Sequence, residues 1–299
     1  MNYWIGLDIG GTKIAAQMVD DTGKVVWQIK APTAKGKGLY PAVCALIDQA
    51  LMHIDPKIDS LNGIGIGIPG KVVPETGEIH LAVNLNIETP FPIGSLLSER
   101  YSTVVNIEND VRLGAIGVQQ LLNKDDVAYI SIGTGLAAGF VLNGQLYRGK
   151  NGLAGEIGHV LETFEDGTPA ILETIVSGPA ILRRAQAADC DVSNPADVFE
   201  LADSGFGPAK RIINHFFHHL ARALQWVALT FDIDHIVLGG GVTQASESFE
   251  DYLRCAVAQL REQSKVANLL LTDDKITILP KLHNPGLWGA TYIARNRPS

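Results

Sequence analysis

The sequence predicts an α/β protein made of two similar halves, and three observations support this fold class. Hydrophobic segments of strand length alternate with segments of helical periodicity. A strand, a glycine-rich turn and a second strand occur near the N-terminus, and the same order recurs after Asp126. The chain has 299 residues, enough for about two domains. We expect each half to present its glycine turn to a shared cleft.

Three strands open the first half. Tyr3–Leu7 is a continuous apolar run typical of a buried strand, and Ile14–Val19 is the next one. Turn residues follow at 20–23, and Lys24–Ile29 completes a predicted antiparallel meander. The rest of this half alternates between the two element types: a helix at 39–54, a strand at 61–68, a hairpin at 71–80, a strand at 103–107 and a helix at 111–122.

The second half repeats the meander. Strands are predicted at 127–132, 137–142 and 145–147, with Asn143-Gly144 as the strongest hairpin signal in the chain. The remainder is mostly helical: we expect helices at 208–231, 247–263 and 287–295, and strands at 235–238 and 276–279.

Composition limits the classes of function. Apolar residues make up 46% of the chain and charged residues 19%, as in ordinary globular proteins. The net charge of −8 disfavours a general nucleic-acid or anionic-membrane surface. No apolar stretch is long enough for a transmembrane helix, and the N-terminus has no basic region typical of a signal peptide. Three isolated cysteines fit reduced thiols, so we expect a cytoplasmic protein.

The turn after the first strand could hold a phosphate tail. Asp8 can bind hydrated Mg²⁺, and Gly10 and Gly11 let backbone N–H groups come close to an anion. Thr12 adds a short donor and Lys13 a positive charge. An ordinary Gly-Gly hairpin turn is the alternative.

Asn109 and Asp110 follow the strand at 103–107, where α/β proteins place ligands. Asn109 could recognise a hydroxyl group, and Asp110 could accept its proton. The alternative is a helix N-cap pair, since both residue types are favoured there.

Glu156 and His159 lie three residues apart after a glycine-rich loop. Both could bind the hydroxyls of a polyol, form half of a metal site, or simply pair with each other. Glu173 is an acid inside an apolar run, and such acids are partnered or functional.

Other motifs carry weaker signals. The glycines at 239–241 could pass under a flat ligand such as adenine or form a plain strand-to-helix turn. We interpret His215, His218 and His219 as a surface or interface feature rather than a metal site. The G-x-G-x-x-G match at 65–70 contains a proline and leads into a hairpin, so it does not predict a dinucleotide site. The segment 144–151 lacks the hydroxyl of a P-loop.

Taken in order, these motifs resemble the sugar kinases of the ROK family, a branch of the actin/hexokinase-like ATPases. The resemblance covers the whole chain and rests on eight segments: residues 8–13, 65–70, 109–110, 133–135, 152–159, 172–178, 239–241 and 286–290.

The resemblance implies a ribonuclease H-like fold with two α/β domains around a cleft. Their predicted limits are residues 1–110, completed by a C-terminal helix within 286–299, and residues 111–285. It also implies an ATP-dependent kinase with Mg²⁺ that phosphorylates a hexose or N-acetylhexosamine, and a homodimer, which the aromatic helix around Phe216, Phe217 and Trp226 also favours. The implied roles are Asp110 as catalytic base; Asn84, Asn109, Glu156, His159 and Glu173 at the sugar; Asp8 at Mg²⁺; and Gly10, Gly11, Thr12, Lys13, Gly133, Thr134, Gly135, Gly239 and Gly240 at the nucleotide.

One departure from the family pattern concerns zinc. Most members carry a cysteine-rich zinc loop after the Glu-x-x-His segment, whereas residues 160–170 contain no cysteine here. We therefore expect no structural zinc site. The sequence does not name the sugar. It leaves polyphosphate as an alternative donor, and it leaves two other functions open: a sugar-binding regulator and an actin- or heat-shock-type ATPase with a protein partner.

Overall fold

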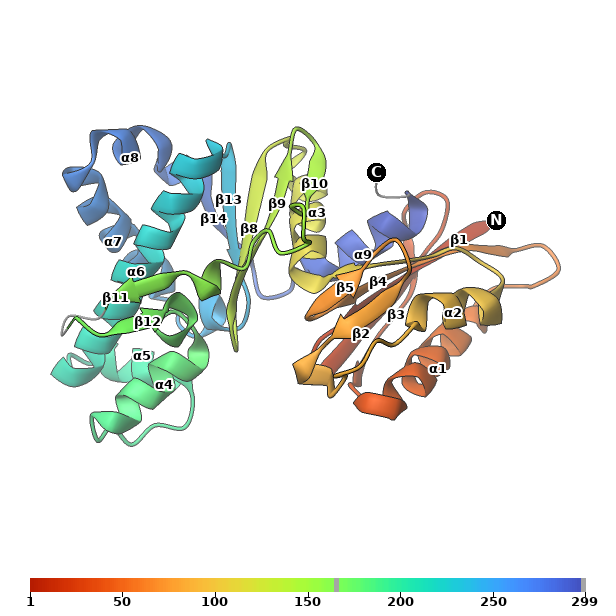
Figure 1. The fold of residues 1–299 in the computed structure, drawn as a ribbon, viewed down its shortest axis with the longest axis horizontal. Helices are drawn as coiled ribbons and strands as arrows, with labels where there is room; N and C mark the ends of the chain where they lie inside the picture. Colours follow the sequence, from red (N-terminus) through yellow and green to blue (C-terminus); the bar gives the residue numbers. More distant parts are fainter. Residues whose placement is uncertain (164–166, 297–299) are drawn as a thin grey trace. The chain divides into compact units, whose positions relative to one another are not determined.

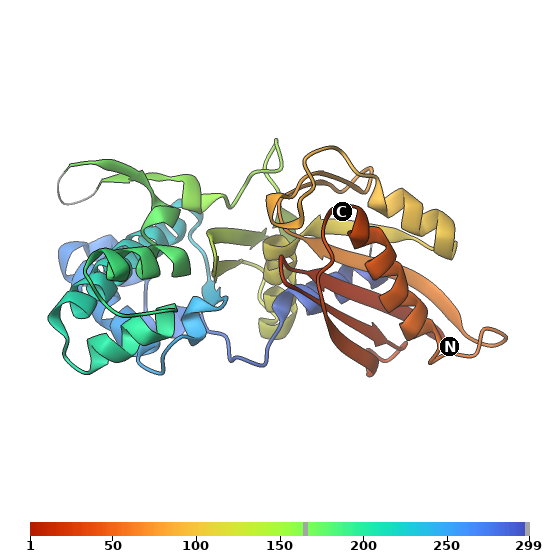
Figure 2. The same ribbon diagram turned by 90° about the horizontal axis from the view of Figure 1, so that it is seen from below.

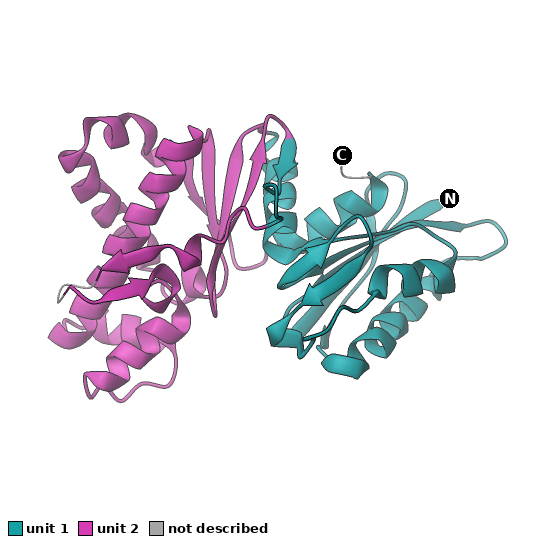
Figure 3. Cartoon of the chain, viewed as in Figure 1, with its two compact units in different colours: residues 1–123, 145–152, 284–299 teal, residues 124–144, 153–283 magenta. Residues whose placement is uncertain are grey.

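The computed structural model describes residues 1–163 and 167–296, which form two compact units. The first contains residues 1–123, 145–152 and 284–299, and the second contains residues 124–144 and 153–283 (Figure 3). Helix α3 (Asp110–Leu122) belongs to the first unit. The predicted division into domains of residues 1–110 and 111–285 stays a prediction.

The sheet of the first unit has the predicted meander at one side. Strands β1 (Asn2–Ile9), β2 (Lys13–Val19) and β3 (Val25–Pro32) pair antiparallel. Strands β4 (Ser60–Ile68) and β7 (Val105–Asn109) add in parallel, which gives the order β3-β2-β1-β4-β7. A small hairpin, β5 (Lys71–Val73) and β6 (Glu78–Leu81), follows β4.

The glycine-isoleucine alternation in β4 separates the two faces of this sheet. Helices α1 (Leu39–Leu51) and α9 (Pro285–Arg295) lie on opposite faces (Figures 1 and 2), and α2 (Ile93–Tyr101) packs into the same core as α1. The isoleucines of β4 belong to that core. On the other face, a Cβ at Gly65 would lie 1.9 Å from the carbonyl oxygen of Ala290 in α9. The G-x-G-x-x-G match therefore marks a close approach between a helix and the sheet.

A second five-stranded sheet repeats the plan of the first. Its order is β10 (Gln145–Tyr147), β9 (Leu136–Leu142), β8 (Val127–Ile132), β13 (His235–Gly239) and β14 (Ile276–Ile278). Strand β10 lies in the segment 145–152 that is counted with the first unit, and the other four strands belong to the second unit. Strand β8 pairs antiparallel with β9 and parallel with β13, as β1 pairs with β2 and β4. This confirms the mixed α/β fold class and the internal symmetry predicted from the two glycine turns.

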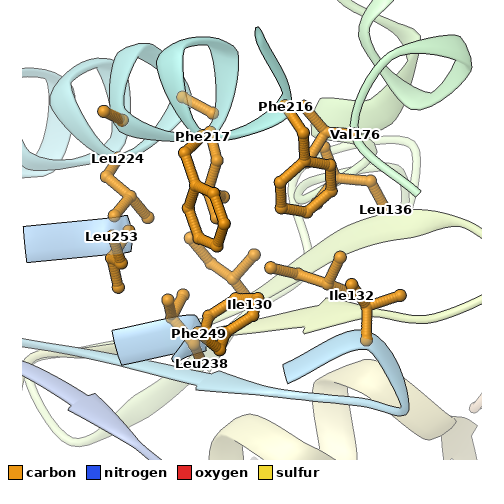
Figure 4. Close-up of a cluster of buried hydrophobic side chains, with 14 of the residues drawn as sticks. Ile130, Ile132, Leu136, Val176, Phe216, Phe217, Leu224, Leu238, Phe249 and Leu253 are labelled. Atoms are coloured by element: carbon orange, nitrogen blue, oxygen red, sulfur yellow. The ribbon is translucent and has the colours of Figure 1, made fainter. Parts of the chain in front are cut away.

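Helices of the second unit enclose an aromatic core. Phe216 and Phe217 of α6 (Gly207–Phe231) and Phe249 of α7 (Phe249–Gln263) pack against Ile130 and Ile132 of β8 (Figure 4). The unit also contains α4 (Gly178–Ala187), α5 (Pro195–Asp203), α8 (Lys265–Leu270) and the hairpin β11 (Leu161–Thr163)–β12 (Pro169–Ile171).

Two sequence interpretations of α6 need correction. Phe216 and Phe217 are fully buried in the core of their own unit, so they cannot support a dimer interface. His219 is buried as well, because its face of α6 lies against β11, and its Nδ1 is 3.5 Å from Glu162 Oε2. Burial lowers the pKa of His219 to about 4. The interpretation of the histidines as a surface feature is therefore wrong for His219.

Within the described ranges, no helix is both long and apolar enough to cross a bilayer.

Candidate active site

The turn between β1 and β2 is anchored from the strand beside it. Gly10 N–H donates to Lys13 O at 2.9 Å and closes the turn. Thr33 Oγ1 donates to Gly10 O at 2.7 Å, and Thr33 N–H donates to Thr12 O at 3.0 Å. Thr12 and Lys13 stay exposed. Because Thr33 donates to two carbonyl groups of the turn, the backbone of the turn is held in place while the side chains at its tip face solvent.

Close packing explains the second glycine of this turn. Neither Gly10 nor Gly11 has the left-handed φ that favours glycine. A Cβ at Gly11 would instead lie 3.3 Å from Asn84 Cβ, in the short helix Val83–Leu85. The structure thus places Asn84, an expected sugar-binding residue, directly beside the first glycine turn.

Asp8 lies one residue before the end of β1, beside the N-terminus of α9. Its Oδ2 accepts a hydrogen bond from Asn284 Nδ2 at 2.9 Å, and Asn284 Oδ1 caps α9 by accepting from Leu287 N–H. Burial raises the pKa of Asp8, and the Asn284 hydrogen bond opposes this effect. A cation would also favour the charged carboxylate. Mg²⁺ is commonly bound by one or two carboxylates and several waters, so this donor fits a hydrated Mg²⁺.

Asn109 and Asp110 begin helix α3, as the N-cap alternative predicted. Asn109 Oδ1 accepts from Val111 N–H at 3.0 Å and from Arg112 N–H at 3.2 Å, and its Nδ2 donates to Gly70 O at 3.2 Å. Asp110 Oδ1 accepts from Val111 N–H at 2.9 Å. Capping fixes the orientation of both side chains and is compatible with either a structural or a chemical role.

Asp8 and Asp110 lie on either side of Gly67. In the parallel register, Asp8 pairs with Gly67, and Gly67 pairs with Glu108. A Cβ at Gly67 would be 3.5 Å from Asp8 Oδ1 and 3.6 Å from Asp110 Cα. The first unit therefore brings two acids to the carboxyl ends of β1 and β7, the two parallel strands that flank β4, beside the first glycine turn.

The turn between β8 and β9 is held by an acid. Gly133 N–H donates to Gly135 O, and Gly178 N–H donates to Gly133 O, both at 2.9 Å. Glu173 Oε2 accepts from Leu136 N–H at 2.9 Å, and a Cβ at Gly135 would lie only 2.4 Å from that oxygen. Glu173 thus packs against the second glycine turn, whose Thr134 is exposed.

Glu156 and His159 are exposed at the two ends of the short helical segment 156–159. Of the ion pairs among the residues with described positions, none joins these two side chains. A Cβ at Gly158, between them, would lie 2.4 Å from Leu136 O and 3.2 Å from Glu173 Cβ. The second unit therefore brings three expected sugar-binding residues together with its glycine turn.

Gly239 and Gly240 are required by contacts inside their own unit. A Cβ at Gly239 would meet Tyr129 Oη at 2.6 Å, and one at Gly240 would meet Ile132 O at 2.4 Å. Gly240 also has φ +97°, a value that favours glycine. These contacts agree with the turn alternative and leave a role at adenine as a prediction.

Sequence reasoning missed two groups of residues near these sites. Asn284 was detectable, because Asn followed by Pro is a typical start of a helix. The buried carboxylate Glu108 has one local partner, Arg112 at i+4, but its second partner, Arg148, is distant in sequence and had no local signal.

The loop expected to lack zinc forms the β11–β12 hairpin, whose residues 164–166 lie outside the described part of the chain. Over the ranges that the structure describes, no group of three His, Cys, Asp or Glu side chains is arranged to hold a metal ion. The expectation about zinc remains a prediction.

Comparison with known proteins gives a consistent picture. A model described as "ROK family" matches residues 4–297. A glucokinase from Halalkalibacterium halodurans is 31% identical over 82% of both chains. An N-acetylmannosamine kinase from Vibrio cholerae is 29% identical over 90% of this chain and 92% of that one. A solved ROK family glucokinase from Streptomyces griseus, in complex with glucose and AMPPNP, is 28% identical with a TM-score of 0.73 over 98% and 99% of the two chains.

Regulators are also among the similar proteins. A xylose repressor from Caldicellulosiruptor bescii is 25% identical, and the match covers 91% of this chain and 74% of the repressor.

Proposed function

Because the chain belongs to the ROK family, we propose that it is an ATP-dependent sugar kinase. The reaction we propose is transfer of the γ-phosphoryl group to a hydroxyl of a hexose or N-acetylhexosamine, with the C6 hydroxyl as the acceptor. The similar glucokinase and N-acetylmannosamine kinase support this substrate class. The glucose and AMPPNP bound by the Streptomyces griseus glucokinase support a sugar acceptor and a nucleotide donor.

The observation that carries the proposal is the pair of acids beside Gly67. A Cβ added at Gly67 would lie 3.5 Å from Asp8 Oδ1 and 3.6 Å from Asp110 Cα. Phosphoryl transfer needs a metal-bound phosphate and an activated hydroxyl close together. Asp8 would hold hydrated Mg²⁺, and Asp110 would accept the proton of the attacking hydroxyl.

The remaining site residues would position the two substrates. Asn109, Glu156, His159, Glu173 and Asn84 are the proposed sugar-binding residues; Gly10, Gly11, Thr12, Lys13, Gly133, Thr134, Gly135, Gly239 and Gly240 are the proposed nucleotide-binding residues. Bound Mg²⁺ supplies positive charge that stabilises the transferring phosphoryl group. The protein contributes orientation, since positioning accounts for much of the catalysis in such reactions.

A coupled ADP-release assay against a panel of hexoses and N-acetylhexosamines tests the proposal. We expect one sugar to be phosphorylated far faster than the others. General base catalysis contributes about 10²- to 10⁴-fold, so Asp110→Asn should lose that much kcat and still bind sugar. Near-normal turnover in Asp110→Asn would refute the base.

A second function is favoured by the similar repressor: a regulator that binds sugar without turnover. The same panel separates the two, because a regulator would bind a sugar in calorimetry and release no ADP. Activity with polyphosphate and none with ATP would change the proposed phosphoryl donor and leave the proposed sugar kinase function in place. We also propose a cytoplasmic homodimer, and a monomer in gel filtration would refute that assembly.

A further inference from the structure

A fully buried carboxylate lies next to the proposed catalytic turn. Glu108 is the residue before Asn109 at the end of β7, and its exposure is 0%. Its Oε1 accepts from Asn109 N–H at 2.8 Å and from Arg112 Nη1 at 3.2 Å. Its Oε2 accepts from Arg148 Nε at 2.6 Å. Glu108, Arg112 and Arg148 form what we name the Glu108 cluster.

The cluster fixes the geometry around it. A buried carboxylate is costly unless it is paired and hydrogen-bonded, and both oxygens of Glu108 have partners. Hydrogen bonds to ionised groups are short and directional. Arg112 is also buried, and its Nε has no hydrogen-bond partner among the described residues. The sequence thus retains a second buried charge at the cost of an unsatisfied donor.

The cluster joins two parts of the chain that are distant in sequence. Arg112 lies in the first turn of α3, and its Nη2 donates to Gly152 O. Arg148 precedes that glycine by four residues, so both arginines fix the segment 145–152 to the start of α3. The backbone N–H of Asn109 binds the same carboxylate, and Asp110 is the next residue. Glu108 therefore holds the backbone of the residue that precedes Asp110.

We propose that Glu108 is a positioning residue, which with Arg112 and Arg148 holds Asp110 at the angle required to accept the proton of the sugar hydroxyl. This role rests on the proposed kinase function. A residue with only a structural role would affect stability and leave kcat unchanged. A positioning residue affects kcat, since small misplacements of reacting groups can cost up to about 100-fold in rate.

Arg148→Met is the first variant, because it keeps the apolar stem and removes the guanidinium from a partly exposed side chain. Arg100→Met is the matched control, since it removes an arginine that pairs with Asp48 at the surface of the same unit. Glu108→Gln is the second cluster variant, and the double variant Glu108→Gln/Arg148→Met completes a cycle. The measurements are kcat, the KM values for sugar and for ATP, and the melting temperature.

We expect kcat to fall about 10- to 100-fold in Arg148→Met, with the KM for ATP within about twofold and Arg100→Met unaffected. The double variant should be little slower than the slower single variant, because groups that act as one unit are not additive. Unchanged kcat in Arg148→Met with a lowered melting temperature would overturn the positioning role, even if Glu108→Gln fails to fold. A wild-type protein that phosphorylates no sugar would instead overturn the proposed function, and the role with it.

Discussion

A methyl group at Gly135 should displace Glu173 and thereby test whether Glu173 orients the sugar. The added Cβ would lie 2.4 Å from Glu173 Oε2, the atom that accepts a hydrogen bond from Leu136 N–H. The clash is with the end of a flexible side chain, so the fold can accommodate it by moving the carboxylate. The hydrogen bond is lost when the carboxylate moves, and a bond to a charged group contributes about 1.5–3 kcal/mol net.

If Glu173 orients the sugar as proposed, the displaced carboxylate also loses its hydrogen bond to a sugar hydroxyl, which is likewise a bond to a charged group and contributes about 1.5–3 kcal/mol. Each 1.4 kcal/mol is a factor of ten, so Gly135→Ala should lower kcat/KM for sugar by about 10- to 100-fold. Steady-state kinetics and thermal melts of the same preparation measure the two effects separately. Gly207→Ala is the control, because its Cβ would meet only an ordinary contact at 3.5 Å with the end of Arg211. A Gly135→Ala enzyme with wild-type kcat/KM would refute the link between Glu173 and the sugar.

Three further predictions concern stability. Gly65→Ala should lower the unfolding free energy by at least about 1–3 kcal/mol, because the Cβ would meet the backbone oxygen of Ala290 at 1.9 Å; an unchanged urea midpoint would contradict the packing of α9. Asn284→Ala should lower the unfolding free energy by about 0.5–2 kcal/mol through the lost cap of α9. It should also raise the Mg²⁺ concentration needed for activity, since Asp8 loses its hydrogen bond; an unchanged magnesium titration would contradict this second effect. His219 has a pKa of about 4 in the folded protein, compared with an ordinary value of 6.5. Between these pH values the unfolded chain binds more protons, so the unfolding free energy should fall by about 3 kcal/mol as the pH drops from 6.5 to 4. His219→Gln should flatten that pH dependence in urea melts.

Local patterns predicted the strands and the long helices of this fold well. Both glycine turns sit between antiparallel strands, as their position between two apolar runs required. The continuous apolar runs became the strands at the centre of each sheet, because strands buried on both faces need no polar alternation. The sequence analysis did not predict α4 and α5 individually, although both begin at residues with N-cap side chains, Ser177 and Asn194.

Long-range pairing was beyond the reach of the same reasoning. His219 looked like part of an exposed histidine cluster, because helical spacing cannot show that β11 covers that face of α6. Glu108 looked like an ordinary strand residue, because its partner Arg148 lies 40 residues away. Phe216 and Phe217 suggested an interface only because their partners in the core could not be identified from the sequence.

The two glycine turns occupy equivalent positions in two similar sheets, yet different neighbours hold them. Thr33 anchors the first turn: its hydroxyl and its backbone N–H donate to the carbonyl oxygens of Gly10 and Thr12. The side chain of Thr12 stays exposed. Glu173 anchors the second turn through Leu136 N–H, and the glycine at 135 leaves room for its carboxylate. Because Glu173 is also a proposed sugar ligand, the second turn cannot move without moving part of the sugar site. The first turn has no such constraint from Thr33, so substitutions at Thr33 should affect the KM for ATP more than the KM for sugar, whereas those at Gly135 should affect both.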